Sequence, residues 1–252
     1  MKMHQRNAGA AETALLIHPM LSSAEGIALC VTDRWGGEVH CLIPDLSGHG
    51  EAAGETYHSA AEEAWSIHDW LLRQGCTHLQ LGFGASLGGV VLFELLRFQD
   101  LTFDRVFFEG VSFYERAPAL CFLLTQVFLA KHRKAVKDPQ LSRRKMSAIY
   151  GQAAGPAMAG RFIAMDETSI RGIIHDCAYV RLPELSPEMQ RCCVFAYGEK
   201  DLDLGQCRKL LAAKYPGAAL RVWPGYGHCG RMTADSQQYA AMLRAYMEKG
   251  TL

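Results

Sequence analysis

The sequence lacks an excess of charge of either sign, and this bears on its partners. Its 252 residues contain 26 Lys or Arg and 26 Asp or Glu, so the formal net charge is zero. A chain without excess positive charge has no general attraction for phosphate backbones, which argues against nucleic acid as a partner. With 49% hydrophobic and 21% charged residues, the composition is that of a globular protein able to bury a core without disulfides.

An apolar run long enough to cross a bilayer is also missing. The most apolar segment, residues 117–130, is 14 residues long and contains Thr125 and Gln126. A transmembrane helix needs about 20 apolar residues. The first 12 residues are polar and hold no apolar signal core. We therefore expect no membrane span and a cytoplasmic location.

The cysteines do not form a disulfide or zinc-binding framework. Their number, nine, is odd, and no C-x-x-C pair is present. Several lie in apolar runs, where a thiol behaves as a small hydrophobe, and this usage is typical of a reducing compartment. We expect no cofactor, no metal, and a monomer or weak homodimer.

What the sequence does contain is a regular alternation of short apolar runs with longer helical patterns. Nearly continuous apolar runs are typical of parallel strands that are covered on both faces. The predicted strands are Ala14–Ile17, Val39–Ile43, Leu79–Phe83, Arg105–Phe108, Cys193–Ala196 and Leu220–Trp223. The predicted helices are Ala24–Trp35, Ser59–Gln74, Gly88–Phe98, Leu204–Lys214 and Ser236–Glu248. This alternation predicts an α/β fold with a mostly parallel six-stranded sheet flanked by helices.

Residues 111–190 interrupt the alternation, because they hold helical patterns but no convincing strand. The segment is too long for a loop in a compact domain. We predict a helical cap or lid inserted before the last two strands, with residues 1–110 and 191–252 forming the α/β core.

Two parts of this predicted cap differ in character. An apolar stretch contains Phe122, Leu123, Leu124, Val127 and Phe128, and we expect it to be the cap's packing surface, with an acyl-pocket lining as the alternative. The next stretch, 131–145, holds seven Lys or Arg and one acid, Asp138. We interpret it as a solvated helical face, and the alternative is a surface that attracts anionic substrates.

One motif joins a predicted strand directly to a predicted helix. Residues 84–88 read Gly-Ala-Ser-Leu-Gly, which matches G-x-S-x-G. A serine on a sharp strand-to-helix turn has a strained backbone, and flanking glycines let strand and helix approach closely. The pattern alone is weak because glycine and serine are common. In this strand–turn–helix context it predicts Ser86 as a nucleophile.

Two further groups follow the last two predicted strands. His228 ends a glycine-flanked run, and an imidazole with a pKa near neutrality can take and return a serine proton. Asp201 follows the preceding strand, where a carboxylate can orient that imidazole. Each residue alone is explained equally well as part of a solvated loop. Because ligands of open α/β sheets bind at the carboxyl ends of strands, their joint placement with Ser86 predicts a Ser86–His228–Asp201 triad.

Three neighbouring residues bear on the same roles. Glu109, at the end of the fourth predicted strand, is the main alternative to Asp201 as the triad acid. Asp203 is a weaker alternative because it lies further from its strand. Cys229 follows His228 directly, and we interpret it as a packing residue.

Acyl chemistry also needs two backbone N–H groups directed at the developing negative charge. Leu87, next to the nucleophile, is expected to supply one. The loop after the first predicted strand reads His18-Pro19-Met20-Leu21 and is expected to supply the other. Met20 is the candidate, because Pro19 has no N–H group.

Outside residues 111–190, the chain resembles the α/β-hydrolase superfamily. The resemblance rests on the G-x-S-x-G turn, on Gly198-Glu199-Lys200-Asp201, on Gly227-His228, and on the chain order Ser, Asp, His. It implies this fold and a serine hydrolase. Relatives with an aspartate nucleophile, the epoxide hydrolases and haloalkane dehalogenases, are excluded by Ser86.

A second loop adds to the resemblance. Residues 44–50 read Pro-Asp-Leu-Ser-Gly-His-Gly and are similar to a P-D-x-x-G-H-G loop common in the superfamily. We interpret Asp45 and His49 as residues that brace a turn. The chain departs from the pattern at Pro19, where glycine is usual, and in its short N-terminus, which leaves no room for the first two strands of the family.

The predicted function is therefore hydrolysis of a small-molecule ester, thioester or related acyl substrate through an acyl-enzyme, as by carboxylic-ester hydrolases. Alternatives are a ligand receptor with little or no turnover, an acyltransferase and a carbon–carbon bond hydrolase. No residue pattern encodes the natural substrate.

Overall fold

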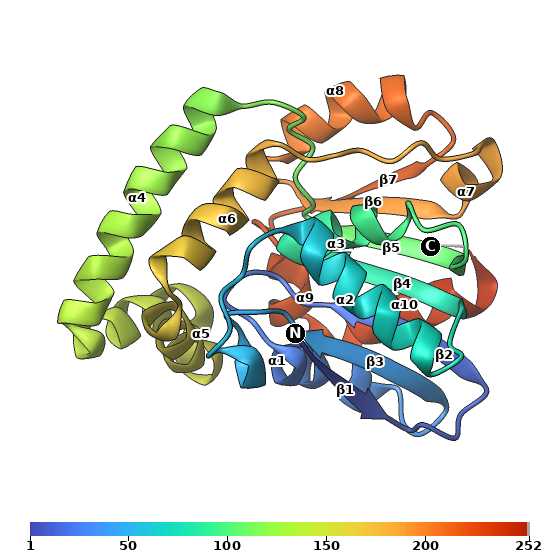
Figure 1. Ribbon diagram of the computed structural model, residues 1–252, viewed down its shortest axis with the longest axis horizontal. Coiled ribbons are helices and arrows are strands. Elements are labelled where there is room, and N and C mark those ends of the chain that lie inside the picture. Colours follow the sequence, from blue (N-terminus) through green and yellow to red (C-terminus); the bar gives the residue numbers. More distant parts are fainter. Residues whose placement is uncertain (251–252) are drawn as a thin grey trace.

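A seven-stranded sheet forms the centre of the molecule (Figure 1). The computed structural model describes residues 1–250, without the side chains of residues 149, 150 and 153. The strand order is β1-β3-β2-β4-β5-β6-β7, with β1 antiparallel to β3 and every other pair parallel. The strands are β1 (Lys2–Arg6), β2 (Glu12–Ile17), β3 (Val39–Asp45), β4 (His78–Ala85), β5 (Thr102–Glu109), β6 (Cys193–Gly198) and β7 (Ala219–Trp223).

All six predicted strands are confirmed, and each observed strand includes the whole predicted range. The prediction of six strands is nevertheless one too few, because residues 2–6 form a seventh, β1, at the edge of the sheet. Its sequence, Lys-Met-His-Gln-Arg, has no buried residue and therefore no apolar pattern to reveal it. The N-terminus thus has room for one antiparallel strand, contrary to our expectation.

Helices cover both faces of the sheet (Figure 1). They are α1 (Ala24–Cys30), α2 (Ala60–Arg73), α3 (Leu87–Leu95), α4 (Pro118–Lys137), α5 (Pro139–Ala164), α6 (Glu167–Ala178), α7 (Pro187–Arg191), α8 (Leu204–Lys214), α9 (Gly230–Ala234) and α10 (Ser236–Lys249), with short 3-10 helices η1 (Thr32–Arg34) and η2 (Gly50–Ala52). The predicted helix 24–35 is shorter than expected, because it ends at Cys30 and continues as η1.

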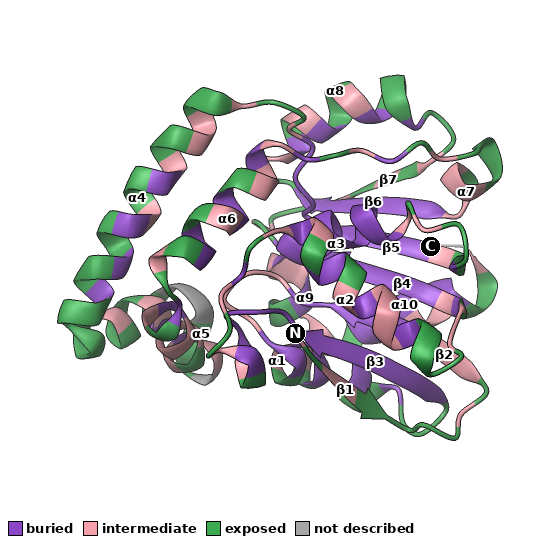
Figure 2. Cartoon of the chain, in the orientation of Figure 1, coloured by how far each residue is buried: buried purple, intermediate pink, exposed green. Residues whose placement is uncertain are grey.

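The alternation of side chains along β2 shows why the central strands are mostly apolar. Leu15 and Ile17 enter the core beneath α2 and α3, whereas Ala14 and Leu16 enter the core beneath α1 and α10. Both faces of a central strand are therefore buried, as in other parallel sheets. Figure 2 shows the central strands buried along most of their length.

The chain between β5 and β6 is helical, with α4, α5 and α6 lying over one edge of the sheet (Figure 1). Pro139 ends α4, since proline disfavours helical backbone in the preceding residue. That residue, Asp138, then caps α5 by accepting the Leu141 N–H at 2.9 Å. Asp166 caps α6 in the same way through Ser169.

Helix α6 is fastened to the core by hydrogen bonds at the start of α2. The Asp176 carboxylate accepts the Tyr57 hydroxyl at 2.8 Å and the Ala60 N–H at 2.5 Å. The Ser169 hydroxyl accepts the Tyr57 N–H at 2.8 Å. Helix α4 contacts α5 and α6, so α6 lies between α4 and the sheet (Figure 1).

The apolar stretch of α4 does not pack as a unit. Leu124 and Phe128 are half-buried against the core, but Phe122, Leu123 and Val127 are exposed. Our expectation that all five form a packing surface is wrong for these three. The helix buries only one face, through residues such as Leu129.

No helix among the described residues is long and apolar enough to cross a bilayer. All nine cysteines are free thiols.

Candidate active site

The predicted site residues gather where the strand order changes direction. The chain passes from β2 to β3 on one side, and β4 lies on the other side of β2. The connections that leave β2 and β4 therefore run in opposite directions, and such a switch point is the usual ligand site of open α/β sheets. Ser86 follows β4 directly, and Met20 lies in the loop after β2.

Ser86 occupies a strained turn between β4 and α3. Its backbone angles, φ 49° and ψ −114°, are unusual for a residue with a side chain. Its N–H donates to the Glu109 carbonyl at 2.8 Å, which holds the turn to the end of β5. The geometry agrees with the sharp strand-to-helix turn that the sequence predicts.

The glycines around Ser86 permit a close approach of helix and strand. A Cβ atom on Gly88 would lie 2.2 Å from the Ile17 carbonyl oxygen at the end of β2. A Cβ atom on Gly84 would lie 2.6 Å from the Gly88 carbonyl oxygen. Any side chain at these positions would push α3 away from the sheet and move Ser86 with it.

The structure brings together the three residues of the predicted triad. The Ser86 Oγ lies 2.9 Å from Nε2 of His228, and Nδ1 of His228 lies 2.9 Å from Oδ2 of Asp201. The Asp201 side chain is buried, whereas that of His228 is 45% exposed. A carboxylate beside Nδ1 keeps the proton of the neutral imidazole on Nδ1. Nε2 is therefore free to accept the hydroxyl proton of Ser86.

The surroundings of His228 favour its protonated form. The Asp201 carboxylate, 2.9 Å from Nδ1, raises the pKa of His228 above the usual value of a histidine. Burial raises the pKa of the Cys229 thiol, so the sulfur remains protonated at neutral pH. An imidazole that is stabilised as the cation is suited to hold a proton taken from a serine hydroxyl.

Glu109, the alternative acid, faces away from the imidazole. Its Oε2 accepts the Trp223 Nε1–H at 3.0 Å and the Tyr239 hydroxyl at 2.9 Å, while Oε1 has no hydrogen-bond partner among the described residues. Burial raises the pKa of Glu109 to about 7. The observed contact to His228 is therefore made by Asp201.

Asp203 lies close to Asp201 and His228 without replacing either of them in the triad contacts. Its N–H donates to Oδ1 of Asp201 at 3.1 Å, and its carboxylate accepts the Ser112 hydroxyl at 3.3 Å. Side-chain atoms of Asp201, Asp203 and His228 lie within 4.8 Å of one another, a spacing that a metal ion can bridge. His228 Nδ1 and Asp201 Oδ2 are already paired with each other, so this cluster belongs to the candidate triad.

The candidate oxyanion donors lie at the start of α3 and in the loop after β2. Leu87 is the first residue of α3, and the first N–H groups of a helix have no acceptor within it. Met20 is part of a turn in which the Ser22 N–H donates to the Pro19 carbonyl at 3.1 Å, with Leu21 at φ 67°. Their roles stay a prediction.

A buried histidine, whose role the sequence did not reveal, braces this turn. Nε2 of His18 accepts the Leu46 N–H at 3.1 Å, so its proton is on Nδ1, which donates to the Pro19 carbonyl at 2.9 Å. Burial lowers the pKa of His18 to about 4, so it is neutral at physiological pH. In the sequence, only the position of His18 directly before Pro19 indicates that it braces the turn.

The loop of residues 44–50 has the bracing role that we expected. Asp45 is buried and accepts the Ala24 N–H at 2.7 Å and the Glu51 N–H at 2.8 Å. Nδ1 of His49 lies 3.0 Å from the Ser47 carbonyl oxygen.

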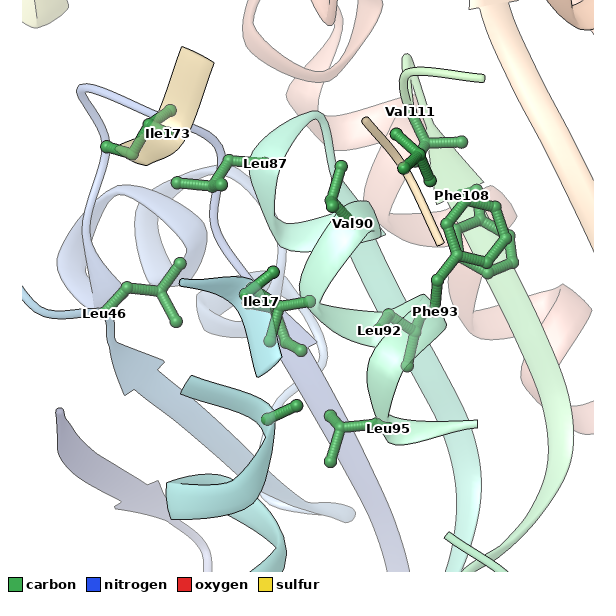
Figure 3. Packing of buried hydrophobic residues seen from close by; sticks show 14 of the residues in the cluster. Ile17, Leu46, Leu87, Val90, Leu92, Phe93, Leu95, Phe108, Val111 and Ile173 are labelled. Atoms are coloured by element: carbon green, nitrogen blue, oxygen red, sulfur yellow. The ribbon is translucent and has the colours of Figure 1, made fainter. Parts of the chain in front are cut away.

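Apolar residues of the core and of α6 enclose the base of the turn (Figure 3). Ile173 of α6 lies beside Leu87, and Val90 and Val111 lie on the adjoining side of α3. All four are buried. The helical segment thus contacts the core next to the predicted nucleophile.

Comparison with known proteins identifies the fold. No protein-family model and no curated protein sequence matches the chain. A thermophilic esterase from Thermogutta terrifontis matches with a TM-score of 0.75 at 15% identity, covering 98% of this chain and 93% of that one. A protein from Desulfitobacterium hafniense described as an α/β hydrolase matches with a TM-score of 0.74 at 16% identity, covering 98% and 100%.

A serine hydrolase from Cycloclasticus zankles matches with a TM-score of 0.71 at 18% identity, covering 98% of this chain and 93% of that one. At such low identity these likenesses concern the fold alone. The chain has the α/β-hydrolase fold, as the resemblance implied.

Proposed function

We propose that the protein is a serine hydrolase that cleaves a small-molecule ester, thioester or related acyl substrate through an acyl-enzyme. The observation that carries the proposal is the chain of contacts from Ser86 Oγ to His228 to Asp201, each of 2.9 Å. The strained backbone of Ser86 supports it, because such strain is common at nucleophiles placed on a sharp turn. Similarity in fold to proteins described as esterases adds to this support.

In this mechanism, Ser86 Oγ attacks the acyl carbonyl carbon while its proton passes to Nε2 of His228. Asp201 stabilises the resulting imidazolium and keeps its other proton on Nδ1. The tetrahedral intermediate then collapses, the bond to the leaving group breaks, and Nε2 returns the proton to that group. Water enters, gives a proton to Nε2 and attacks the acyl-enzyme. In a second collapse the bond to Ser86 Oγ breaks, Nε2 returns the proton to Oγ, and the acid is released.

The oxyanion of each intermediate is held by backbone N–H groups in this proposal. Leu87 supplies one from the start of α3, and Met20 supplies the other from the turn that His18 braces. Each such donor is typically worth about 10²–10³ in turnover.

The segment 111–190 acts as a cap over the core of residues 1–110 and 191–252 in this proposal. Ile173 of α6 packs beside Leu87, so the size of the acyl group that fits at Ser86 depends on the position of α6. We further propose that the enzyme uses no cofactor, that it is a monomer or weak homodimer, and that it is located in the cytoplasm.

The test combines a fluorophosphonate probe with p-nitrophenyl esters of increasing acyl length. Wild type is expected to be labelled on Ser86 and to hydrolyse the short esters. Ser86→Ala should lose both properties, whereas Ser142→Ala, a control on α5, should keep them. Folded wild-type protein that is not labelled would favour the ligand receptor instead. A product ratio that changes with added alcohol would indicate an acyltransferase.

A further inference from the structure

The outer face of α4 is an apolar surface that nothing in the described part of the chain covers. Phe122 is 70% exposed and Leu123 is 58% exposed. Val127 and Val136 are exposed on the same helix, so α4 carries four of the nine large exposed hydrophobic residues in the described chain. Isolated exposed apolar residues need no explanation, but a cluster on one helix does.

The face changes character along the helix. Residues 118–130 contain no charged residue, and the exposed positions among them are Pro118, Ala119, Phe122, Leu123, Gln126, Val127 and Ala130. Residues 131–137 then add Lys131, Arg133, Lys134 and Lys137, all of them exposed. One outward face of a single helix is thus apolar over its first part and basic over its second.

Most of this basic charge is not neutralised within the protein. Arg133 is paired with Glu167 at 2.7 and 2.9 Å. Lys131, Lys134 and Lys137 have no acidic partner within 4.0 Å among the described residues. Their positive charge is available to an external anion.

The charge of the chain is correspondingly uneven. Residues 131–145 hold seven of the 26 basic residues and one of the 26 acidic residues. The rest of the chain therefore has 19 basic and 25 acidic residues. A neutral protein with such a basic segment presents one face to negative surfaces and is repelled over much of the remainder.

The position of α4 separates this face from the candidate active site. Helix α6 lies between α4 and the sheet, and the outer face of α4 is exposed along its length (Figures 1 and 2). Phe122 and Leu123 are exposed to solvent there. The face is available to something outside the chain.

We propose that the outer face of α4 docks on an anionic lipid bilayer, with Phe122 and Leu123 entering the interface and Lys131, Lys134 and Lys137 meeting the headgroups. Helices that lie in a membrane interface combine Phe and Leu with Lys and Arg. On α4 both kinds lie on the face that the protein leaves uncovered, the apolar residues in its first part and the basic residues in its second. The basic side chains are attracted to an anionic surface, and the apolar side chains stabilise the bound helix by inserting into the bilayer interface. The helix lies on the bilayer and does not span it. This inference goes beyond the proposed function and does not depend on it.

The test is sedimentation with vesicles of phosphatidylcholine alone and of phosphatidylcholine mixed with phosphatidylglycerol. Wild type is expected to bind the mixed vesicles and to release them as salt increases, because screening weakens charge attraction. Ser86→Ala should bind equally well, which separates docking from catalysis.

Two pairs of variants test the two parts of the face. Leu123→Ser should lower binding roughly tenfold through lost apolar burial, while Leu29→Ser, at the same 58% exposure on α1, should not. Lys134→Glu with Lys137→Glu should lower binding to the mixed vesicles by at least about tenfold. Lys209→Glu with Lys249→Glu, an equal charge change elsewhere, should have little effect. Circular dichroism and thermal unfolding serve as the check that each variant is folded.

Three results would overturn the proposal. The first is no binding of wild type to the mixed vesicles, and the second is equal binding to both kinds of vesicle. The third is equal loss of binding in the α4 variants and their controls. If light scattering instead shows a dimer that Leu123→Ser dissociates, a second copy of the chain covers this face.

Discussion

Replacing Asp201 by asparagine is the sharpest test of the candidate triad, because the structure predicts how the new amide will orient. The N–H of Asp203 donates to Oδ1 of Asp201 at 3.1 Å. In the Asp201→Asn variant the amide oxygen would remain with that donor, and the amide NH₂ would face Nδ1 of His228. An imidazole that accepts at Nδ1 has its proton on Nε2, where it cannot take the proton of Ser86.

The expected loss follows from this reversed tautomer. Turnover should fall by about 10³–10⁴, as in other triads with the wrong tautomer. That range corresponds to about 4–5.5 kcal/mol of transition-state stabilisation, at roughly 1.4 kcal/mol for each tenfold. The remaining activity should also have an acidic limb at lower pH, since the Asp201 carboxylate helps to raise the pKa of His228 in wild type.

The assay is the pH dependence of kcat and kcat/KM on a p-nitrophenyl ester, with Glu109→Gln as the matched variant. Glutamine retains an oxygen that can accept from Trp223 and Tyr239, and the observed contacts of Glu109 do not include the imidazole. Its kcat should therefore stay within about tenfold of wild type, far above that of Asp201→Asn. A thousandfold loss in Glu109→Gln with a small loss in Asp201→Asn would show that the assignment of the acid is wrong.

Two other substitutions probe the same site. Gly110 has φ 62°, and an added Cβ would lie 3.2 Å from Asp201 Oδ2, Cys229 Sγ and His228 Cε1. Gly110→Ala should thus lower the free energy of unfolding by about 1–2 kcal/mol and lower kcat by on the order of 10². Thermal unfolding and steady-state kinetics measure the two effects, with Gly9→Ala as the control. An unchanged kcat would contradict the geometry. Cys229→Ala should leave the acidic limb of kcat/KM in place, because the buried thiol is uncharged and donates to the Glu109 carbonyl; a limb that moves to lower pH would show that the sulfur carries negative charge beside His228.

The sequence by itself determined the architecture of this protein. A strand that is buried on both faces is apolar at nearly every position, so the parallel strands are visible as runs such as Ala14–Ile17. The serine turn was visible for a related reason, because close approach of helix and strand requires glycine at positions 84 and 88. By contrast, β1 has no buried residue, and nothing in its composition distinguishes it from a loop.

Only the tertiary structure decided which acid meets His228. Asp201 and Glu109 both lie at or just beyond the end of a strand, and sequence position does not say where a side chain points. Alternation along β5 turns Glu109 toward Tyr239 beneath α10, while the turn after β6 brings Asp201 to the imidazole. The outer face of α4 is a similar case, since an apolar helix buries only the side that its neighbours reach. Local physics sets the pattern of a segment, but the direction of each side chain depends on the elements packed around it.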